Sequence, residues 1–239
     1  MIETTEAHFS PDKVDGVIFD IGGVFLYPHF SPVRSLQIVL GLEVPEELES
    51  YRRAHHAGCR ALAEGTRAPA EHDHDFWLDY DRAYTASLGI PDQHLASFRS
   101  AVRTRWDWPH DANIASFHRL AETGRPLAIV SNNDGSAEES MQTFGVCQVG
   151  PGPLPSVAIV VDSALAGVAK PDPAIMTPAL DLLGLAAERT LYVGDTVHAD
   201  VVGATRAGMQ VVQLDPYDHH RDYPHPRVSD LAELLDRLS

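Results

Sequence analysis

The stretch Val17-Ile18-Phe19-Asp20-Ile21-Gly22-Gly23-Val24-Phe25 is the one around which the rest of the chain is organised. Three apolar residues lead into an acid, and a glycine pair follows almost at once. This order is typical of a buried strand that ends in a tight turn. A carboxylate at the end of a buried strand is costly unless it is hydrogen-bonded, paired with a cation or bound to a metal. We therefore expect other segments to supply partners for Asp20.

Four later apolar runs predict further strands: Leu127–Val130, Val157–Val161, Leu191–Val193 and Val211–Leu214. They are continuously apolar or nearly so, as expected of strands covered on both faces. Helical patterns that end in glycine lie between the later runs. The alternation predicts an α/β fold, with a Rossmann-like parallel sheet and helices on both of its faces.

The segment between Tyr27 and Trp108 interrupts this alternation, because it contains no comparable strand run. Its apolar residues recur at helical spacing instead, in series that begin at Val33, Ala54 and Phe76. We expect an all-helical insert of about four helices. The chain would then divide into a core domain of residues 1–26 and 109–239 and an inserted domain of residues 27–108.

Composition narrows the classes of partner. The 239 residues are 44% hydrophobic and carry a net charge of −16, which disfavours nucleic acid and anionic membrane surfaces. Cys59 and Cys147 lie far apart, so free thiols in a reducing compartment are expected. Residues 1–12 lack the basic start and apolar stretch of a secretory signal, and no apolar run approaches the roughly 20 residues of a bilayer span. A cytoplasmic protein is predicted.

Polar residues follow the predicted strands where a ligand would bind. In an open parallel sheet the ligand lies beyond the carboxyl ends of the strands, which places Asp20, Ser131 and Asp195 at one edge. Lys170 precedes a helix start at Pro171-Asp172-Pro173, and Asp200 follows Asp195 by five residues. Carboxylates without sulfur or nitrogen partners suit Mg²⁺, and a metal, a lysine and backbone N–H groups suit a phosphoryl group. Asp20 would be either a metal ligand alone or a ligand and a nucleophile.

At these positions the sequence resembles the haloacid dehalogenase (HAD) superfamily, in the branch that has a helical cap domain inserted after the first motif. Four motifs occur in order: Phe19–Val24, Ile129–Asn133, Lys170–Pro173, and Val193–Asp200 followed by Gly203-Ala204 and Ala207–Met209. The resemblance implies Mg²⁺-dependent hydrolysis of a small phosphorylated metabolite through an aspartyl-phosphate.

The same resemblance implies roles for individual residues. Asp20 would be the nucleophile and a Mg²⁺ ligand, and Asp195 a second ligand. The backbone carbonyl of Gly22 and the carboxylate of Asp200 would complete the metal cluster, which Asp200 orients. Ser131 and Lys170 would hold the phosphoryl oxygens, and Gly23 and Asn132 belong to the same substrate-binding set.

Gly22 departs from the family pattern, because phosphatases of the superfamily usually carry an aspartate there that protonates the leaving group. Such a group is worth about 10²–10⁴-fold in rate. Three explanations stay open: a leaving group that needs little protonation, a replacement such as Tyr27 or His29, or altered chemistry. Dehalogenases of the superfamily also lack that aspartate, but they use no metal and do not need the Asp195 and Asp200 pair. A 2-haloacid dehalogenase and a catalytically silent phosphate-binding module are the alternatives.

Two further expectations concern local features. Pro178 should interrupt the helix after Lys170, because proline removes an N–H and crowds the preceding turn. The histidines at 72 and 74, and those at 219, 220 and 225, lack the spacing of a structural zinc site and are expected to lie in solvent. His55 and His56 are better placed for a substrate contact, and Arg60 and Arg67 are expected to form surface ion pairs.

Overall fold

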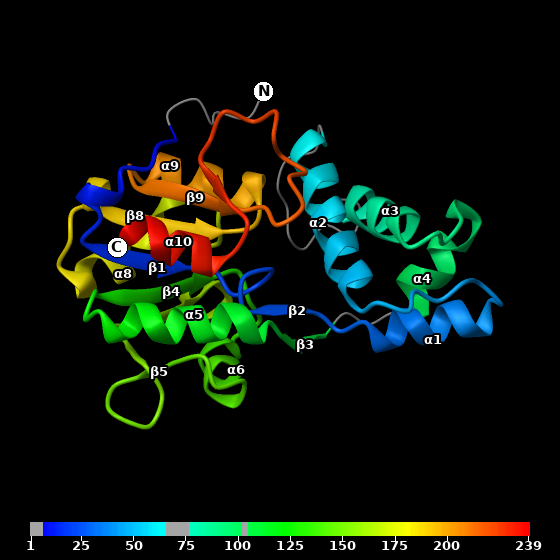
Figure 1. Ribbon diagram of the computed structural model, residues 1–239, viewed down its shortest axis with the longest axis horizontal. Helices are drawn as coiled ribbons and strands as arrows, with labels where there is room; N and C mark the ends of the chain where they lie inside the picture. Colours follow the sequence, from blue (N-terminus) through cyan, green and yellow to red (C-terminus); the bar gives the residue numbers. More distant parts are fainter. Residues whose placement is uncertain (1–6, 66–76, 102–104) are drawn as a thin grey trace. The chain divides into compact units, whose positions relative to one another are not determined.

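The computed structural model describes residues 7–65, 77–101 and 105–239. The chain forms two compact units, drawn in Figure 1. One unit contains the chain up to Phe25 together with Pro109–Ser239, and the other contains Leu26–Trp108. Among the described residues, no helix combines the length and the apolar character that crossing a bilayer requires.

The first unit is built on a six-stranded sheet in the order β10-β9-β8-β1-β4-β7, and every neighbouring pair is parallel. The predicted α/β fold class is confirmed. Strand β1 lies inside the sheet, and its Val17 is in register with Leu127 on one side and Leu191 on the other. The strand bounds are β1 Gly16–Phe19, β4 Leu127–Ser131, β7 Val160–Asp162, β8 Thr190–Gly194, β9 Gln210–Leu214 and β10 Arg227–Val228.

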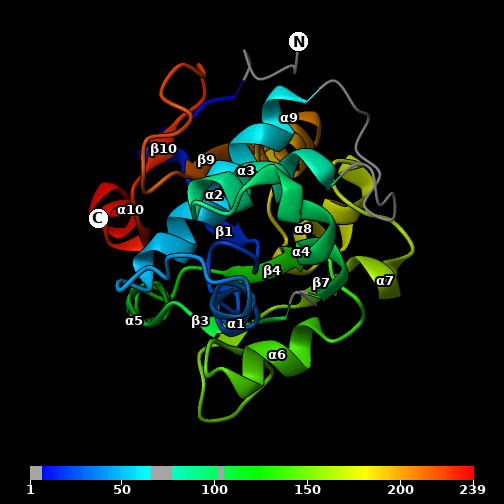
Figure 2. The same cartoon turned by 90° about the vertical axis from the view of Figure 1, so that its right-hand side faces the viewer.

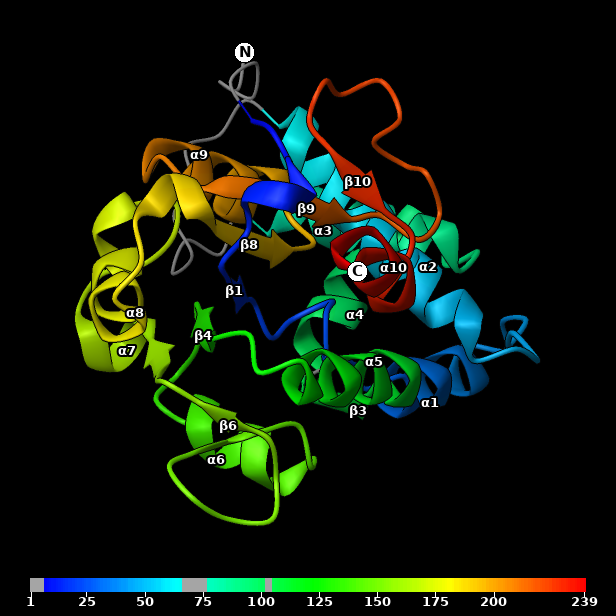
Figure 3. The same cartoon turned by 60° about the vertical axis from the view of Figure 1, so that its left-hand side comes forward.

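Helices cover both faces of this sheet (Figure 3). On one face lie α5 (Asp111–Glu122) and α10 (Leu231–Leu238), and on the other lie α8 (Thr177–Leu183) and α9 (Val202–Arg206). The shorter α6 (Ala137–Thr143) and α7 (Ser163–Ala166) flank β7. Helix α10 begins after Asp230, whose carboxylate accepts a hydrogen bond from the Glu233 N–H.

One strand prediction is wrong, and one strand of the main sheet was not predicted. The run Val157–Val161 is not one strand: β6 (Ser156–Val157) pairs with β5 (Gln148–Val149) in a separate small sheet, and β7 begins only at Val160. Apolar periodicity cannot show that a chain leaves one sheet for another within five residues. The edge strand β10 was not predicted, because two residues are too short to form an apolar run.

The predicted interruption at Pro178 is confirmed. Residues Pro173–Met176 form a 3₁₀ turn, and α8 begins separately at Thr177 with Pro178 in its first turn. Proline is tolerated there because the N–H of a first-turn residue has no partner within the helix. Asp172 caps the 3₁₀ turn, since its carboxylate accepts a hydrogen bond from the Ala174 N–H.

The second unit is mainly helical, with α2 and α3 packed side by side (Figure 2). Its helices are α1 Ser31–Val39, α2 Glu49–Glu64, α3 Leu78–Ser87 and α4 Leu95–Ala101. Its core includes Tyr51, Tyr80, Tyr84 and Phe98. The unit is not entirely helical, however: β2 (Leu26–Pro28) and β3 (Trp106–Pro109) form a two-stranded sheet. Trp106-Asp107-Trp108 alternates apolar and polar residues, a strand signal too short to stand out.

Several residues named from the sequence lie outside the described part of the chain. They are Arg67, Phe76 and the stretch from His72 to Asp75.

Candidate active site

Asp20 is placed by the sheet and by the turn that follows it. Its N–H donates to the Val193 carbonyl of β8 at 2.8 Å, so the residue continues the ladder just beyond β1. The chain then turns back on itself, and the Phe25 N–H donates to the Ile21 carbonyl at 2.9 Å. The rings of Phe19, Phe25 and Phe117 meet with centroids 5.2–5.7 Å apart, which fastens both ends of this turn to α5.

Three acids meet at the carboxyl edge of the sheet. One carboxylate oxygen from each of Asp20, Asp195 and Asp200 lies within 4.8 Å of the other two, and all three residues are buried. They come from the ends of β1 and β8 and from the π-helical turn Val197–Val201. Such turns are rare and are found frequently at functional sites. The structure therefore brings together the three acids that the sequence singled out.

Lys170 is the cation of this cluster, and it is 4% exposed. Its ammonium forms ion pairs with Asp20 Oδ1 at 2.8 Å and Asp200 Oδ1 at 2.7 Å, and it donates to the Tyr192 hydroxyl at 3.0 Å. Three contacts match the three N–H donors of an ammonium group. The Tyr192 hydroxyl in turn donates to the Val130 carbonyl at 2.8 Å, which ties Lys170 to both β8 and β4.

Both carboxylate oxygens of Asp200 are engaged within the protein. Oδ2 accepts from the Thr196 N–H at 2.8 Å and from the Thr196 hydroxyl at 2.6 Å, while Oδ1 faces Lys170 and Tyr192. A Cβ on Gly194 would lie 2.3 Å from the Asp200 carboxyl carbon, so only glycine fits there. Asp200 is thus held by Thr196 and in turn orients the Lys170 ammonium.

The glycine pair after Asp20 serves Asp195. Gly23 has φ +65°, and a Cβ at this position would lie 2.1 Å from Asp195 Oδ2. The carboxylate therefore rests directly against the backbone of the turn, where a side chain would displace it. Gly22 is not among the glycines with positive φ.

The second motif positions the lysine. Ser131 ends β4 and is buried, and Asn132 follows it. The Asn132 side chain forms two hydrogen bonds with the backbone of Lys170. Its Oδ1 accepts from the Lys170 N–H at 2.8 Å, and its Nδ2 donates to the Lys170 carbonyl at 3.1 Å. The peptide bond from Lys170 to Pro171 is cis.

The charge of the cluster suits a divalent cation. When all three carboxylates are ionised they face one ammonium, which leaves two negative charges in a buried space. Burial raises the pKa of Asp20 to about 7, with Lys170 opposing the shift and Asp200 and Asp195 adding to it. Burial alone would lower the pKa of Lys170, but the carboxylates of Asp20 and Asp200 hold this pKa well above its ordinary value. An all-oxygen donor set of this kind fits Mg²⁺.

Two other strand-end acids are structural. Asp162 accepts hydrogen bonds from the N–H groups of Gly135, Ala137 and Ala164, and so braces the loop after Ser131. Asp215 accepts from the N–H groups of His219 and His220. Tyr192, Thr196 and Gln213 were not predicted from the sequence. Gln213 donates a hydrogen bond to the Asp195 carbonyl at 2.8 Å. A polar residue inside an otherwise apolar strand was the available signal for Tyr192 and Gln213.

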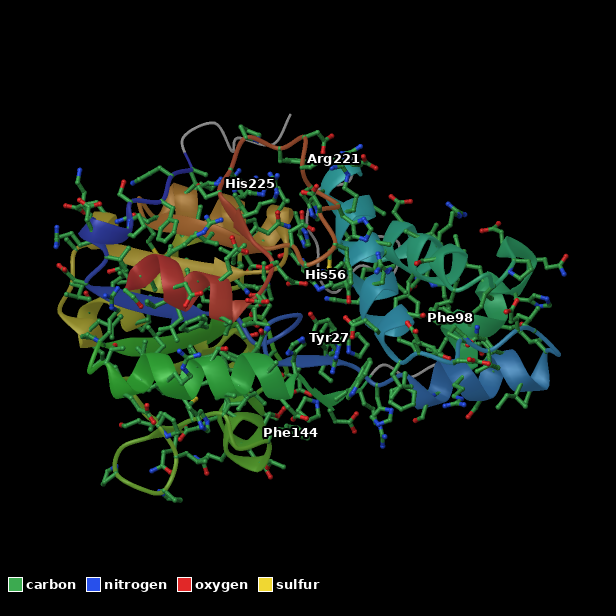
Figure 4. The ribbon with its side chains drawn as sticks, viewed as in Figure 1. Tyr27, His56, Phe98, Phe144, Arg221 and His225 are labelled. Carbon is green, nitrogen blue, oxygen red and sulfur yellow. The ribbon has the colours of Figure 1, made fainter. Side chains whose placement is uncertain are left out.

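The helical unit has its own buried polar group, shown in Figure 4. The Tyr27 hydroxyl and His56 Nε2 are 2.8 Å apart, and both residues are fully buried. His55 Nδ1 lies 2.7 Å from the Tyr80 hydroxyl. His29 is used locally instead, because its Nδ1 accepts from the Ser31 N–H at the start of α1. Of the histidines expected in solvent, His220 and His225 are buried.

Comparisons with known proteins show which family the sequence matches. The sequence model described as haloacid dehalogenase-like hydrolase matches residues 14–208. A ribulose-1,5-bisphosphate 5-phosphatase of Halopiger xanaduensis is 27% identical over 93% of this chain and 90% of its own length. A phosphoserine phosphatase of Thermus thermophilus is 38% identical over 62% of this chain and 58% of its own length.

Solved structures share the fold. The putative HAD-hydrolase YfnB of Bacillus subtilis, solved with bound magnesium, has a TM-score of 0.58 at 19% identity, over 95% of this chain and 99% of the other. The L-2-haloacid dehalogenase RSc1362 has a TM-score of 0.52 at 22% identity, over 94% of this chain and 98% of the other. At these identities the likeness concerns the fold alone. Since a magnesium-bound HAD-hydrolase and a haloacid dehalogenase match almost equally, chemistry must be argued from the site.

Proposed function

Because this chain belongs to the haloacid dehalogenase-like hydrolases, we propose that it is a Mg²⁺-dependent phosphatase that acts on a small organic phosphate monoester. The observation that carries this proposal is the buried group of Asp20, Asp195 and Asp200 around Lys170. Both relatives named above are phosphatases of small phosphorylated metabolites. We propose further that residues 27–108 form the cap domain and residues 1–26 and 109–239 the catalytic core.

In this proposal Asp20 and Asp195 hold Mg²⁺ with the carbonyl of Gly22, and Asp200 steadies the group through Thr196 and Lys170. The cation would balance the two excess negative charges and offset the charge of the phosphoryl group. In this proposal Asp200 is not itself a Mg²⁺ ligand, because both of its carboxylate oxygens already accept hydrogen bonds within the protein.

The Asp20 carboxylate would attack phosphorus and form an aspartyl-phosphate, while the bond to the leaving oxygen breaks and the alcohol departs. Water then attacks the phosphoenzyme, which releases inorganic phosphate and restores the carboxylate. Lys170 and Ser131 would hold the equatorial oxygens, with backbone N–H groups near Gly23 and Asn132. Lys170 must exchange one of its three present contacts for a phosphoryl oxygen, and its contact with Asp20 is the one that changes as Asp20 reacts.

Gly22 supplies no acid for the leaving group. His29 Nδ1 accepts a hydrogen bond at the start of α1, and the Tyr27 hydroxyl is paired with His56, so both side chains already have partners within the helical unit. We therefore favour a substrate whose leaving oxygen needs little protonation.

Substitution of Asp20 tests the covalent mechanism. Asp20→Asn should lower turnover of a phosphate monoester by about 10³-fold or more while the protein stays folded, because nucleophile and ligand charge are lost together. Asp172→Asn is the control: it makes the same change two residues from Lys170, and asparagine caps a helix as well as aspartate does. If the Asp20 variant retained a tenth of the wild-type rate, an aspartyl-phosphate would be excluded.

The glycine at position 22 favours one second candidate, a hydrolytic dehalogenase of 2-haloacids. In that case Asp20 would displace halide from carbon, and no metal would be required. Halide release measured beside phosphate release, each with Mg²⁺ and with a chelator, separates the two. Halide release that ignores the chelator would replace the phosphatase proposal, and the absence of both activities across a metabolite screen would favour a silent phosphate-binding module.

A further inference from the structure

A buried glutamine connects Asp195 to the loop between β9 and β10. Gln213 lies in β9, in register with Gly194, and its side chain is fully buried. Its Nε2 donates to the Asp195 carbonyl at 2.8 Å and lies 3.2 Å from His220 Nδ1. Its Oε1 lies 2.6 Å from His225 Nε2. All polar atoms of this amide are therefore engaged.

The chemistry of these contacts fixes the amide in one orientation. An amide oxygen only accepts hydrogen bonds, so His225 must donate through Nε2–H. An amide nitrogen only donates, so His220 Nδ1 must accept. The reverse orientation would place the glutamine oxygen against the Asp195 carbonyl, and two acceptors cannot share a hydrogen bond. The Asp195 carbonyl thus fixes which end of the amide faces it, and His225 holds the other end through Oε1.

The loop between β9 and β10, residues 215–226, holds the two histidines in place. Asp215 accepts from the His219 and His220 N–H groups at 2.9 and 2.8 Å, and the guanidinium of Arg227 lies 3.5 Å from it. The Gln213 N–H donates to the Pro226 carbonyl at 3.0 Å, which closes the loop at its other end. Figure 4 shows His225 on this loop.

We propose that Gln213 is a positioning residue for Asp195, and that the loop 215–226 acts on the metal site through it. This inference rests on the proposed function, because it assumes that Asp195 ligates Mg²⁺. The Asp195 carboxylate rests against Gly23 on one side, and the Gln213 amide fixes the backbone that carries it on the other. With the backbone released, the carboxylate would no longer be held where the cation needs it.

The test compares two glutamines of the same strand. Gln213→Met removes the hydrogen bonds but keeps the length of the side chain. Gln210→Met is the matched control: Gln210 is equally buried and also bonds to the backbone, at Ser10, Lys13 and Glu188, but at the other end of β9. Mg²⁺ binding to each folded protein is measured by isothermal titration calorimetry without substrate, and the Mg²⁺ concentration for half-maximal turnover is measured separately.

Gln213→Met should weaken Mg²⁺ binding about 10- to 100-fold, the range seen when residues behind a metal ligand are replaced. Gln210→Met should lower stability without changing Mg²⁺ affinity. Equal affinity in the Gln213 variant and the wild type, or an equal loss in both variants, would overturn the inference while leaving the phosphatase proposal intact. A wild type that binds no Mg²⁺ would instead overturn the proposed function.

A double substitution tests the part played by His225. His225→Phe removes the donor that faces Gln213 Oε1 and should weaken Mg²⁺ binding less than Gln213→Met does. Adding it to Gln213→Met should cost nothing more, since the two act through one amide. Effects that simply add would show that His225 does not act through Gln213.

Discussion

The two neighbouring glycines of the first motif, Gly22 and Gly23, have different structural roles. Gly23 is constrained twice, by its positive φ and by the Asp195 carboxylate against which it lies. Gly22 has neither a positive φ nor, in this sequence, the acid expected by resemblance. A substitution at Gly22 can therefore probe chemistry with little backbone strain.

Gly22→Asp should accelerate hydrolysis of an alkyl phosphate by about 10-fold or more, because the new carboxyl can protonate a poor leaving group. It should change the rate on an activated aryl phosphate much less, since that leaving oxygen hardly needs a proton. The measurement is a pair of kcat values on folded protein.

Gly23→Ala provides the contrast. Its Cβ would displace the Asp195 carboxylate, and the left-handed conformation adds about 1 kcal/mol or more of strain. The rates on both the alkyl and the aryl phosphate should therefore fall. Equal changes on both substrates for Gly22→Asp would show that leaving-group protonation is not what Gly22 lacks.

At the scale of elements, the loop 215–226 makes stability depend on pH. Burial lowers the pKa of His225 to about 4 from its ordinary 6.5, with the positive charge of Arg227 adding to the shift and Asp215 opposing it. Between pH 6.5 and pH 4, His225 binds a proton in the unfolded chain but not in the folded protein. Stability therefore falls as the pH drops from 6.5 towards 4.

Urea unfolding at pH 6.5 and pH 5 measures this effect. Over this interval the wild type should lose about 1.6 kcal/mol more of its free energy of unfolding than His225→Gln, because one pH unit corresponds to about 1.4 kcal/mol and the unfolded histidine is already half protonated at pH 6.5. The glutamine variant keeps a donor for Gln213 but cannot take up the proton. Identical losses in the two proteins would mean that His225 titrates normally in the folded state.

The elements also show what sequence patterns can and cannot predict. Continuous apolar runs located β1, β4, β8 and β9, because a strand buried on both faces must be apolar throughout. Two-residue strands such as β10 have no periodicity to detect. Among site residues, the acids at strand ends were visible from their position, whereas Gln213 and Tyr192 matter through partners that lie 18 and 22 residues away along the chain. The register of β8 and β9 brings Gln213 to Asp195, and the hydrogen bonds from Asn132 after β4 hold Lys170 beside Tyr192.

At the scale of the whole molecule, the net charge of −16 means that any added salt will relieve repulsion. Specific Mg²⁺ binding must be distinguished from this general effect. At ten times its dissociation constant, Mg²⁺ should stabilise the protein by about 1.4 kcal/mol beyond NaCl of equal ionic strength. Asp195→Asn should lose this increment and keep the general salt effect, as followed by thermal unfolding. A variant that kept the full increment would remove Asp195 from the ligand set.

The central position of β1 has a consequence for the newly made chain. Its two neighbours in the sheet lie far along the chain: Val17 pairs with Leu127, 110 residues later, and with Leu191, 174 residues later. A ribosome that builds the chain from its amino terminus therefore releases a wholly apolar strand long before either neighbour exists. The helical unit, whose contacts are local, can form in the meantime. Asp20 gains its lysine only after residue 170 emerges, so during synthesis this ion pair forms late, well after β1 itself has left the ribosome.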